Sequence, residues 1–548
     1  MQRSLRYTAK RFLPLLFVCM FALILLNAVV VPQTASAHAS LVQAQPEAGT
    51  KLQSSPPQIS VTFNEQLDAG LFYIKVLDHN GDEITSNKAY MNKEQTGIFL
   101  DLPKLTEGFY LINYHVISAD GHPVAGSYPI TIGNPPQEEA LDLPSVYGGH
   151  NHGTGQLTTK DLLQYASRGL WYLMMLALTG WVIWLRMLGA SGKDSRKSLS
   201  NWTLNLQRAQ LVALLLLIFT HIEALLGGGG AQEIWKLFSA TSIGISWALL
   251  LVLSFLGFVL IGRGKWLDLL WPLCLLAVKS FSGHAASFTP LWATIGLDFI
   301  HLVGAACWVG GLVLLYAKWR QKSDDVSSYM QRFSKMALIS ILVLTLSGSL
   351  SVLLFLPNLS YLLYTSWGIL LLVKIGAVAL VVLIGFIIRL NLRKQKSKQS
   401  VLWIKVDLTF MVIIVLLVGL ITYMAPIPVN EPLQWHQMGE KVHVSADITP
   451  KIQGTNTFVG KVWLPEKAGK PKQVLMLLHY LDDKEMAPIS VPITMYEDST
   501  QEESYGFVKF SYKAQGAYLP FRGNWELEMR VMDADDNETV YTKEFMVY

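Results

Sequence analysis

Eight apolar stretches fill the middle of the chain and limit what it can fold into more than any other feature. Each is close to the ~20 residues that a helix needs to cross a bilayer. Hydrophobic residues make up 51% of the 548, more than an ordinary soluble domain of this size carries. The stretches lie at about 164–188, 206–226, 243–262, 266–283, 293–317, 335–356, 368–390 and 403–424. We therefore expect an eight-helix membrane domain at 161–425, in the plasma membrane.

The distribution of Lys and Arg orients this domain. Cations follow the first, third, fifth and seventh stretches: Lys193, Arg196, Lys197, Arg263, Lys265, Lys318, Arg320, Lys322, Arg393, Lys394, Lys396 and Lys398. The connections at 282–292 and 356–367 contain neither residue. Since cationic loops stay in the cytoplasm, we expect the soluble domains at both ends to lie outside the cell.

The N-terminus has the pattern of a secretory leader. A basic beginning and an apolar run to about Val31 precede the small-x-small triplet Ala35-Ser36-Ala37. This predicts a signal peptide at 1–37, with an uncleaved signal anchor as the alternative. Cleavage after Ala37 makes His38 the first residue. Its α-amine and imidazole Nδ1 then form a chelate ring that suits Cu(II).

Two soluble β domains flank the membrane region. Residues 38–133 contain short alternating stretches with turn signals, as at Ile59, Val61 and Phe63, which predicts a small sandwich. Residues 134–160 form a Pro- and Gly-rich linker. Its His150 and His152 either belong to a solvated tether or catch copper transiently. Residues 426–548 predict a second β-sandwich, with strands near 442–448, 458–464, 474–480, 506–512 and 525–532.

The stretch from Ser118 to Val124 is the second place where metal chemistry is indicated. Asp120 and His122 are two apart, so in an extended segment they project to the same side. With His38 they supply two imidazoles, an amine and a carboxylate, a set suited to Cu(II). An Asp-x-His pair alone is common in surface turns. The terminal histidine in the same domain favours the metal site.

Ionisable residues within the apolar stretches form a further candidate site. Such residues are costly in a bilayer and suggest function. His221, His284 and the i, i+3 pair Asp298 and His301 all fall in the outer half of the predicted domain. We expect these four to form a membrane path for copper. Separate structural hydrogen bonds between helices are the alternative.

Other polar and soft side chains in this region leave their roles open. Lys279 and Lys374 are expected to pair with Asp298 or Glu223. Three soft donors suit Cu(I), although packing is their more common role: Met174, Met175 and Cys307.

The N-terminal domain resembles CopC periplasmic copper-binding domains. The resemblance lies in His38-Ala39-Ser40-Leu41, Pro46, Gly49, Pro56-Pro57, Ile59, Val61, Phe63, Glu65, Gly108-Phe109-Tyr110 and Ser118-Ala119-Asp120-Gly121-His122-Pro123-Val124. It implies that His38, Asp120 and His122 are Cu(II) ligands. Met91 is the only methionine of residues 38–133, so the methionine-rich Cu(I) site of some family members is not expected. His79 and His115 match no ligand position and are interpreted as surface or structural.

The membrane region resembles the CopD family of copper-associated membrane proteins. The resemblance lies in Ser282-Gly283-His284-Ala285, Asp298, His301 and Trp308-Val309-Gly310-Gly311. A CopC–CopD fusion followed by an outer β domain resembles YcnJ-type copper uptake proteins, and its last part is similar to small YtkA-like domains. Near the start of that part, His436 and Met438, with His443 nearby, are candidate copper ligands. Incidental surface residues are the alternative.

These features predict copper acquisition rather than enzymatic activity. Cu(II) captured by the first domain would pass through the membrane domain, where Cu(I) is a candidate species. An extracytoplasmic copper chaperone or reductase would be a fitting partner, and nucleic acid would not. The sequence has no Walker-type nucleotide motif. Two alternatives stay open: copper sequestration without import, and a membrane redox protein that ligates a haem through two of His221, His284 and His301.

Overall fold

The computed structural model describes residues 41–46, 51–63, 65–78, 81–133, 135, 158–188, 193–228, 230–321, 326–356, 359–393, 397–424, 426, 432–439, 441–449, 451–483, 485–496 and 507–547. The predicted signal peptide, His38, His79, His150 and His152 lie outside the described residues.

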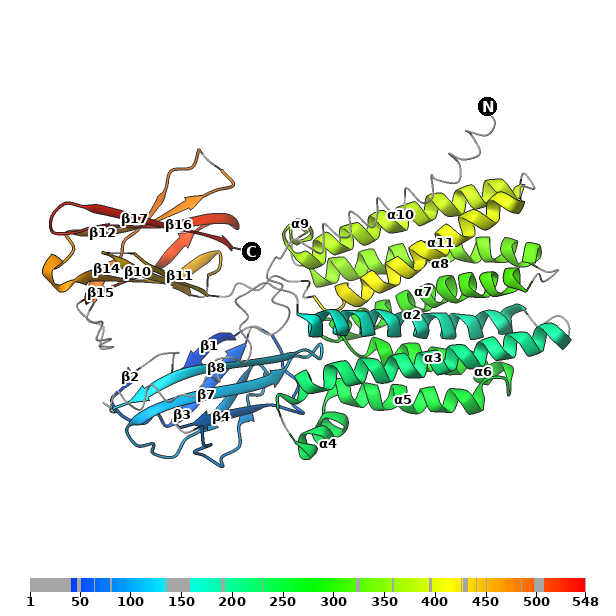
Figure 1. The fold of residues 1–548 in the computed structure, drawn as a ribbon, viewed down its shortest axis with the longest axis horizontal. Helices are drawn as coiled ribbons and strands as arrows, with labels where there is room; N and C mark the ends of the chain where they lie inside the picture. The colour runs from blue at the N-terminus through cyan, green and yellow to red at the C-terminus, as the bar shows by residue number, and fades with distance from the viewer. Residues whose placement is uncertain are drawn as a thin grey trace.

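The N-terminal domain consists of two four-stranded sheets packed face to face (Figure 1). One sheet has the order β1-β3-β6-β5 and the other β2-β8-β7-β4. The strands are β1 Leu41–Gln45, β2 Lys51–Leu52, β3 Gln58–Phe63, β4 Tyr73–Leu77, β5 Tyr90–Met91, β6 Gly97–Asp101, β7 Gly108–Ile117 and β8 Pro123–Ile132. The alternation along β3 places Ile59, Val61 and Phe63 in the core. The predicted sandwich is confirmed.

The middle of the chain folds into a bundle of long helices. They are α2 Thr159–Leu188, α3 Lys193–Leu226, α5 Ser242–Leu260, α6 Lys265–Ser280, α7 Leu291–Arg320, α8 Val326–Phe355, α10 Ser366–Arg393 and α11 Ser397–Ile421. Three short helices were not predicted: α4 Ala231–Ala240, the 3₁₀ helix η3 His284–Ala286 and α9 Tyr361–Tyr364.

Seven of the described helices are long and apolar enough to cross a membrane. The predicted segment at 266–283 is the exception, because its helix α6 has only 16 residues. At 1.5 Å per residue it is about 24 Å long, short of the ~30 Å of a hydrocarbon core. The chain leaves the helix after Ser280, and Gly283 has a φ of 83°. His284 therefore lies in the turn that follows α6.

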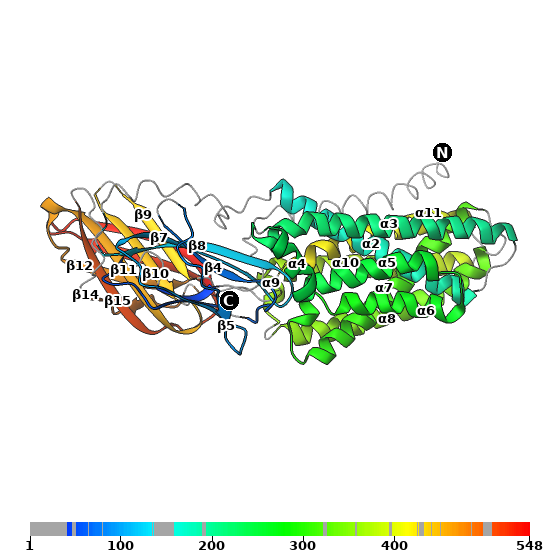
Figure 2. The same ribbon diagram turned by 90° about the horizontal axis from the view of Figure 1, so that it is seen from below.

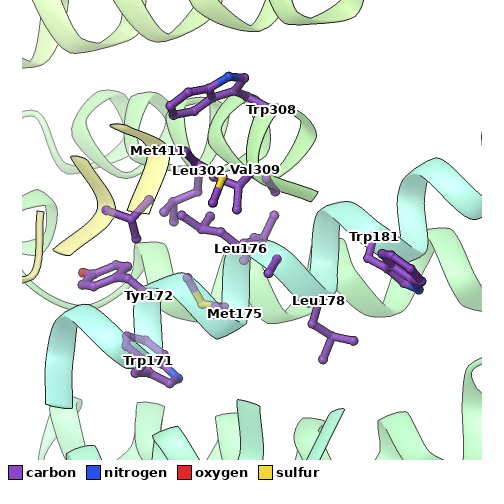
Figure 3. Packing of buried hydrophobic residues seen from close by; sticks show 14 of the residues in the cluster. Trp171, Tyr172, Met175, Leu176, Leu178, Trp181, Leu302, Trp308, Val309 and Met411 are labelled. Atoms are coloured by element: carbon purple, nitrogen blue, oxygen red, sulfur yellow. The ribbon is translucent and has the colours of Figure 1, made fainter. Parts of the chain in front are cut away.

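Helix α2 forms the centre of the bundle, where it packs against α7 and α11 (Figure 3). Met175 and Trp181 of α2 are fully buried, and Met411 reaches the same core from α11. Gly180 of α2 and Gly310 of α7 bring the two backbones so close that a Cβ on either would meet the other helix. Small residues commonly allow such approach in membrane bundles.

The C-terminal domain is a second two-sheet structure. Its sheets have the orders β14-β15-β11-β10-β9 and β13-β12-β16-β17. The strands are β9 Leu433–Met438, β10 His443–Thr449, β11 Gly454–Pro465, β12 Gln473–Tyr480, β13 Ile489–Val491, β14 Thr494–Tyr496, β15 Phe507–Leu519, β16 Gly523–Met532 and β17 Glu538–Val547. The five expected strands are present. β9, β13, β14 and β17 were not predicted.

Both β domains lie beyond the same end of the helical bundle (Figures 1 and 2). The N-terminal domain contacts the helix ends directly. Tyr73 donates a hydrogen bond to the carbonyl of Gly227 at 2.9 Å. The Asp68 carboxylate accepts from the backbone N–H and the hydroxyl of Ser242, at 2.8 and 2.7 Å. This carboxylate lies at the N-terminus of α5, where the helix dipole favours a negative charge.

At the opposite end, a buried ion pair joins two helices of the bundle. Arg186 of α2 pairs with Asp268 of α6, whose side chain is 2% exposed and also accepts from the Gly262 N–H at 2.7 Å. We expect Asp268→Ala to destabilise the helical domain by about 1.5–3 kcal/mol, because it removes the acceptor of hydrogen bonds from Arg186 and the Gly262 N–H. Thermal unfolding of the purified full chain measures this. Glu223 pairs with Lys160 at 3.0 Å but is 79% exposed, so Glu223→Ala should cost less than about 1 kcal/mol. Equal losses of stability in the two variants would contradict the view that the Arg186–Asp268 pair stabilises the bundle more than the exposed Lys160–Glu223 pair does.

Candidate metal centre at a domain boundary

The Ser118–Val124 stretch forms the tight turn between β7 and β8. The Gly121 N–H donates to the Ser118 carbonyl at 2.9 Å, and Gly121 has a φ of 91°. The expectation of an extended segment was therefore wrong. The turn nevertheless brings the two side chains together, with His122 Nδ1 2.9 Å from Asp120 Oδ1. Ser118 Oγ also donates to Asp120 Oδ1.

His284 of the helical domain meets this turn. Its Nδ1 lies 3.2 Å from Asp120 Oδ2, so one carboxylate contacts two imidazoles from different domains. The rings of His122 and His284 are nearly parallel, with centroids 6.2 Å apart. Asp120 and His122 are buried, and the side chain of His284 is almost so. The turn and the helical domain thus enclose the three side chains together.

Arg168 and Tyr423 lie between this group and the interior of the bundle. Arg168 Nη1 is 3.4 Å from His122 Nε2 and donates to the Thr422 carbonyl at 2.9 Å. Its guanidinium lies 5.0 Å from the centre of the Tyr423 ring. Burial raises the pKa of the Tyr423 phenol, which donates to Gln164 Oε1 at 3.0 Å. The His122 ring meets the Tyr423 ring edge-on at 5.2 Å.

His221 also lies near this tyrosine. Its ring is 6.2 Å from that of Tyr423. His221 Nδ1 is 2.9 Å from the Leu217 carbonyl and 3.0 Å from Thr220 Oγ1. Its Nε2 is buried and has no hydrogen-bond partner among the described residues. Tyr423 therefore lies near two histidines, His122 and His221.

The other predicted membrane residues lie elsewhere. His301 Nδ1 is 2.9 Å from Ser347 Oγ of α8. Asp298 interacts electrostatically with Lys279, His284 and Lys374. Lys279 Nζ donates to the Ser282 carbonyl at 3.0 Å, and Glu223 pairs with Lys160, so the pairing of either lysine with Asp298 stays a prediction. Met175 is packed in the helical core, and Met174 packs against it.

No group of three or more His, Cys, Asp or Glu side chains in the described part of the chain has a geometry that would hold a metal ion. His221, His284 and His301 do not form the single cluster that the sequence suggested. The Asp120, His122 and His284 side chains contact one another through hydrogen bonds instead. His436 and Met438 lie in the C-terminal domain, on β9.

Two residues of this site were not predicted, Arg168 and Tyr423. Arg168 falls inside the first apolar stretch, where an ionisable residue is itself a signal of function. The same criterion singled out Lys279 and Lys374, and it would have found Arg168. Tyr423 lies at the end of the last stretch and carries no such signal.

Comparisons with known proteins bear on both domains. The family model described as CopC domain matches residues 41–133, and that described as Copper resistance protein D (CopD) matches residues 327–426. Copper transport protein CutJ of Bacillus subtilis (strain 168) is 28% identical over 551 residues, 94% of this chain and 97% of that protein. Protein YobA of Escherichia coli (strain K12) is 28% identical over 20% of this chain and 92% of its own length. The crystal structure of CopC from Methylosinus trichosporium OB3b is 30% identical and covers 17% of this chain and 93% of that chain, with a TM-score of 0.17.

One chain thus carries a match to the CopC domain model in its N-terminal β domain and a match to the CopD model in the second half of its helical region. The CopD match begins in α8 and extends just beyond α11, so it includes Tyr423 but not His284. The CopC turn therefore contacts both the matched part of the helical region and the part that precedes it. The resemblance noted at Ser282–Gly311 rests on residues outside the matched range.

Gly121 allows the CopC turn to dock. A Cβ at this position would lie 2.8 Å from Ile243 of α5, and the φ of 91° disfavours other residues.

We expect Gly121→Ala to loosen the CopC domain from the helices, with faster hydrogen exchange at the first turns of α5. Gly228→Ala is the matched control, because its φ is 85° and nothing lies within 4 Å of the added Cβ. Equal exchange in the two variants would show that backbone strain, rather than docking, explains the effect.

Proposed function

We propose that this protein acquires copper at the cell surface. The CopC domain captures Cu(II) with His38, Asp120 and His122, and His284 receives the ion for passage through the CopD region into the cell. The contact of the Asp120 carboxylate with His122 and His284 carries the proposal, because it makes a ligand for capture also a neighbour of the membrane domain. The name of the Bacillus subtilis relative, a copper transport protein, supports the same substrate.

The beginning of β1 supports a role for His38. Leu41 pairs with Phe63 at the end of β3. Shortly after β3, the Gln66 carbonyl accepts from the Ala119 N–H at 3.0 Å, so the chain there runs beside the Asp120 turn. Two residues lie between His38 and Leu41, so His38 is at most about 11 Å from the start of β1. We propose that the terminal amine and imidazole of a processed chain reach Asp120 and His122 from there.

The fold supports an outward orientation and eight crossings. Cationic residues at the ends of α2, α7 and α10, such as Arg186, Lys318 and Arg389, lie at the bundle end away from the β domains (Figure 1). Cations on that side favour a cytoplasmic location for it. Because both β domains lie at the other end, the number of crossings between them must be even. The short α6 supplies the eighth, beside the seven longer helices.

His221 is the next station on the proposed route. Its ring, like that of His122, lies near Tyr423, and its buried Nε2 is oriented by the hydrogen bond at Nδ1. Arg168 contacts the same tyrosine and His122. A fixed guanidinium repels a copper cation, so Asp120 must offset that repulsion at the capture site. His301, which is hydrogen-bonded to Ser347 of α8, follows His221 on the proposed copper route.

His38→Ala should weaken Cu(II) binding by the purified full-length protein at least about 100-fold, since it removes one arm of the chelate. Competition titration against a chelator of known affinity measures this. N-terminal sequencing of the mature chain must start at His38. Unchanged affinity in the variant would remove His38 from the site.

His284→Ala separates capture from transfer. We expect Cu(II) affinity to fall only about tenfold, as for a group that contacts a metal ligand, while cell copper under starvation falls to that of the deletion strain. Ser287→Ala in the same loop is the control and should take up copper normally. If cells with the His284 variant retain wild-type copper, transfer does not use this residue.

If deletion causes sensitivity to excess copper without lowering cell copper, the protein sequesters copper. A Soret band in the purified protein would indicate the haem alternative.

A further inference from the structure

The strand register of the C-terminal domain gathers soft donors on one sheet face. β9 is the edge strand, and His436 and Met438 are two residues apart on it. β10 pairs antiparallel with β9 and places His443 directly opposite Met438. Residues in these relations share one face of a sheet. His436, Met438 and His443 therefore form a compact set, called here the edge triad.

The edge triad faces away from the core of its domain. Leu433 and Trp435 of β9 are buried on the other face, as are Val444 and Ala446 of β10. Met438 is 69% exposed. The buried Met476 and Met529 do the packing in this domain, so Met438 contributes little to stability. A thioether held in solvent beside two imidazoles is available for a ligand.

The spacing allows one ion to contact all three side chains. Directly opposed residues have Cβ atoms about 4.5–5.5 Å apart, and residues two apart on a strand are about 7 Å apart. Imidazole and thioether side chains are long enough to converge across such gaps. The third donor is a sulfur, so the set differs in kind from a group of His, Cys, Asp or Glu.

Trp463 of β11 places an aromatic side chain on the same face. It lies directly opposite His443 in the sheet, and its ring meets that of His436 at 5.5 Å, nearly perpendicular. This contact orients the His436 ring. An indole face beside a donor set also attracts cations.

We propose that the edge triad is a Cu(I) site. Thioether and imidazole ligands favour Cu(I) over harder ions. On β9 and β10 the nearest carboxylate of this face is Asp447, which is four residues beyond His443 and diagonal to His436 at about 7–8 Å. Lys461 and Lys509, opposite Ser445 and Trp463, lie on the neighbouring strands. Repulsion from fixed cations doubles for a divalent ion, which further favours a monovalent one.

Cu(I) titration of the full-length protein tests this site. The protein is held under ascorbate without oxygen, and Cu(I) is partitioned against bathocuproine disulfonate. We expect Met438→Leu to lose about one Cu(I) equivalent, or to bind it at least about tenfold more weakly, with less Cu–S scattering in X-ray absorption. Met438→Cys keeps a soft donor and should retain the ion. Because Met438 is exposed, thermal unfolding should not change.

Met495→Leu is the matched control, since Met495 is a 41% exposed methionine on β14, at the opposite edge of the same sheet. It should bind as much Cu(I) as the wild type. Wild-type Cu(I) binding by Met438→Leu would overturn the proposal, and so would an equal loss in Met495→Leu. His38→Ala should leave this Cu(I) binding intact while it weakens Cu(II) capture, so the failure of one proposal can be told apart from the failure of the other.

Discussion

The contact of one carboxylate with two imidazoles holds the rest of the arrangement together. Asp120 reaches His122 within its own turn and His284 across a domain boundary. All three side chains are largely removed from water, where unpaired polar groups are costly. Each therefore needs the others, and the contact can persist only while the CopC domain stays docked. Gly121 against α5 and Asp68 against Ser242 are the contacts that keep it there.

A cation placed beside a metal site imposes a second constraint. Arg168 lies against His122 and Tyr423 and donates to the Thr422 carbonyl. In the proposed function, its charge disfavours copper just inward of Asp120, so the ion rests at the carboxylate and not beyond it. Passage inward then requires either a shift of the guanidinium or a path around it, past Tyr423 and the nearby His221. In this proposal the copper ion rests at Asp120, and the Arg168 charge prevents it from passing inward without control.

Local patterns predicted most of the architecture, and contacts between distant residues were beyond them. Alternation located the strands around Ile59 and Val444 because the period of two is set within a few residues. Helix α6 was predicted to reach residue 283, but it ends at Ser280, and Gly283 with its positive φ begins the next turn. The edge strand β9 was not predicted because only Leu433 and Trp435 of it are buried.

The Asp120–His122 pair was predicted because its members are two residues apart. His284, 164 residues beyond Asp120, was assigned instead to a histidine cluster that the fold does not form. No periodicity encodes such a pairing.

The two proposed sites differ in the hardness of their donors, and that difference has a chemical consequence. The boundary site offers nitrogen and oxygen, which suit Cu(II), whereas the edge triad offers a thioether, which suits Cu(I). Copper that moved between the two proposed sites would have to change oxidation state, which needs a reductant. In these proposals the two β domains therefore bind copper in different oxidation states. Under this view the chain takes Cu(II) at the boundary of its first domain, and its last domain responds to reduced copper on the same side of the membrane.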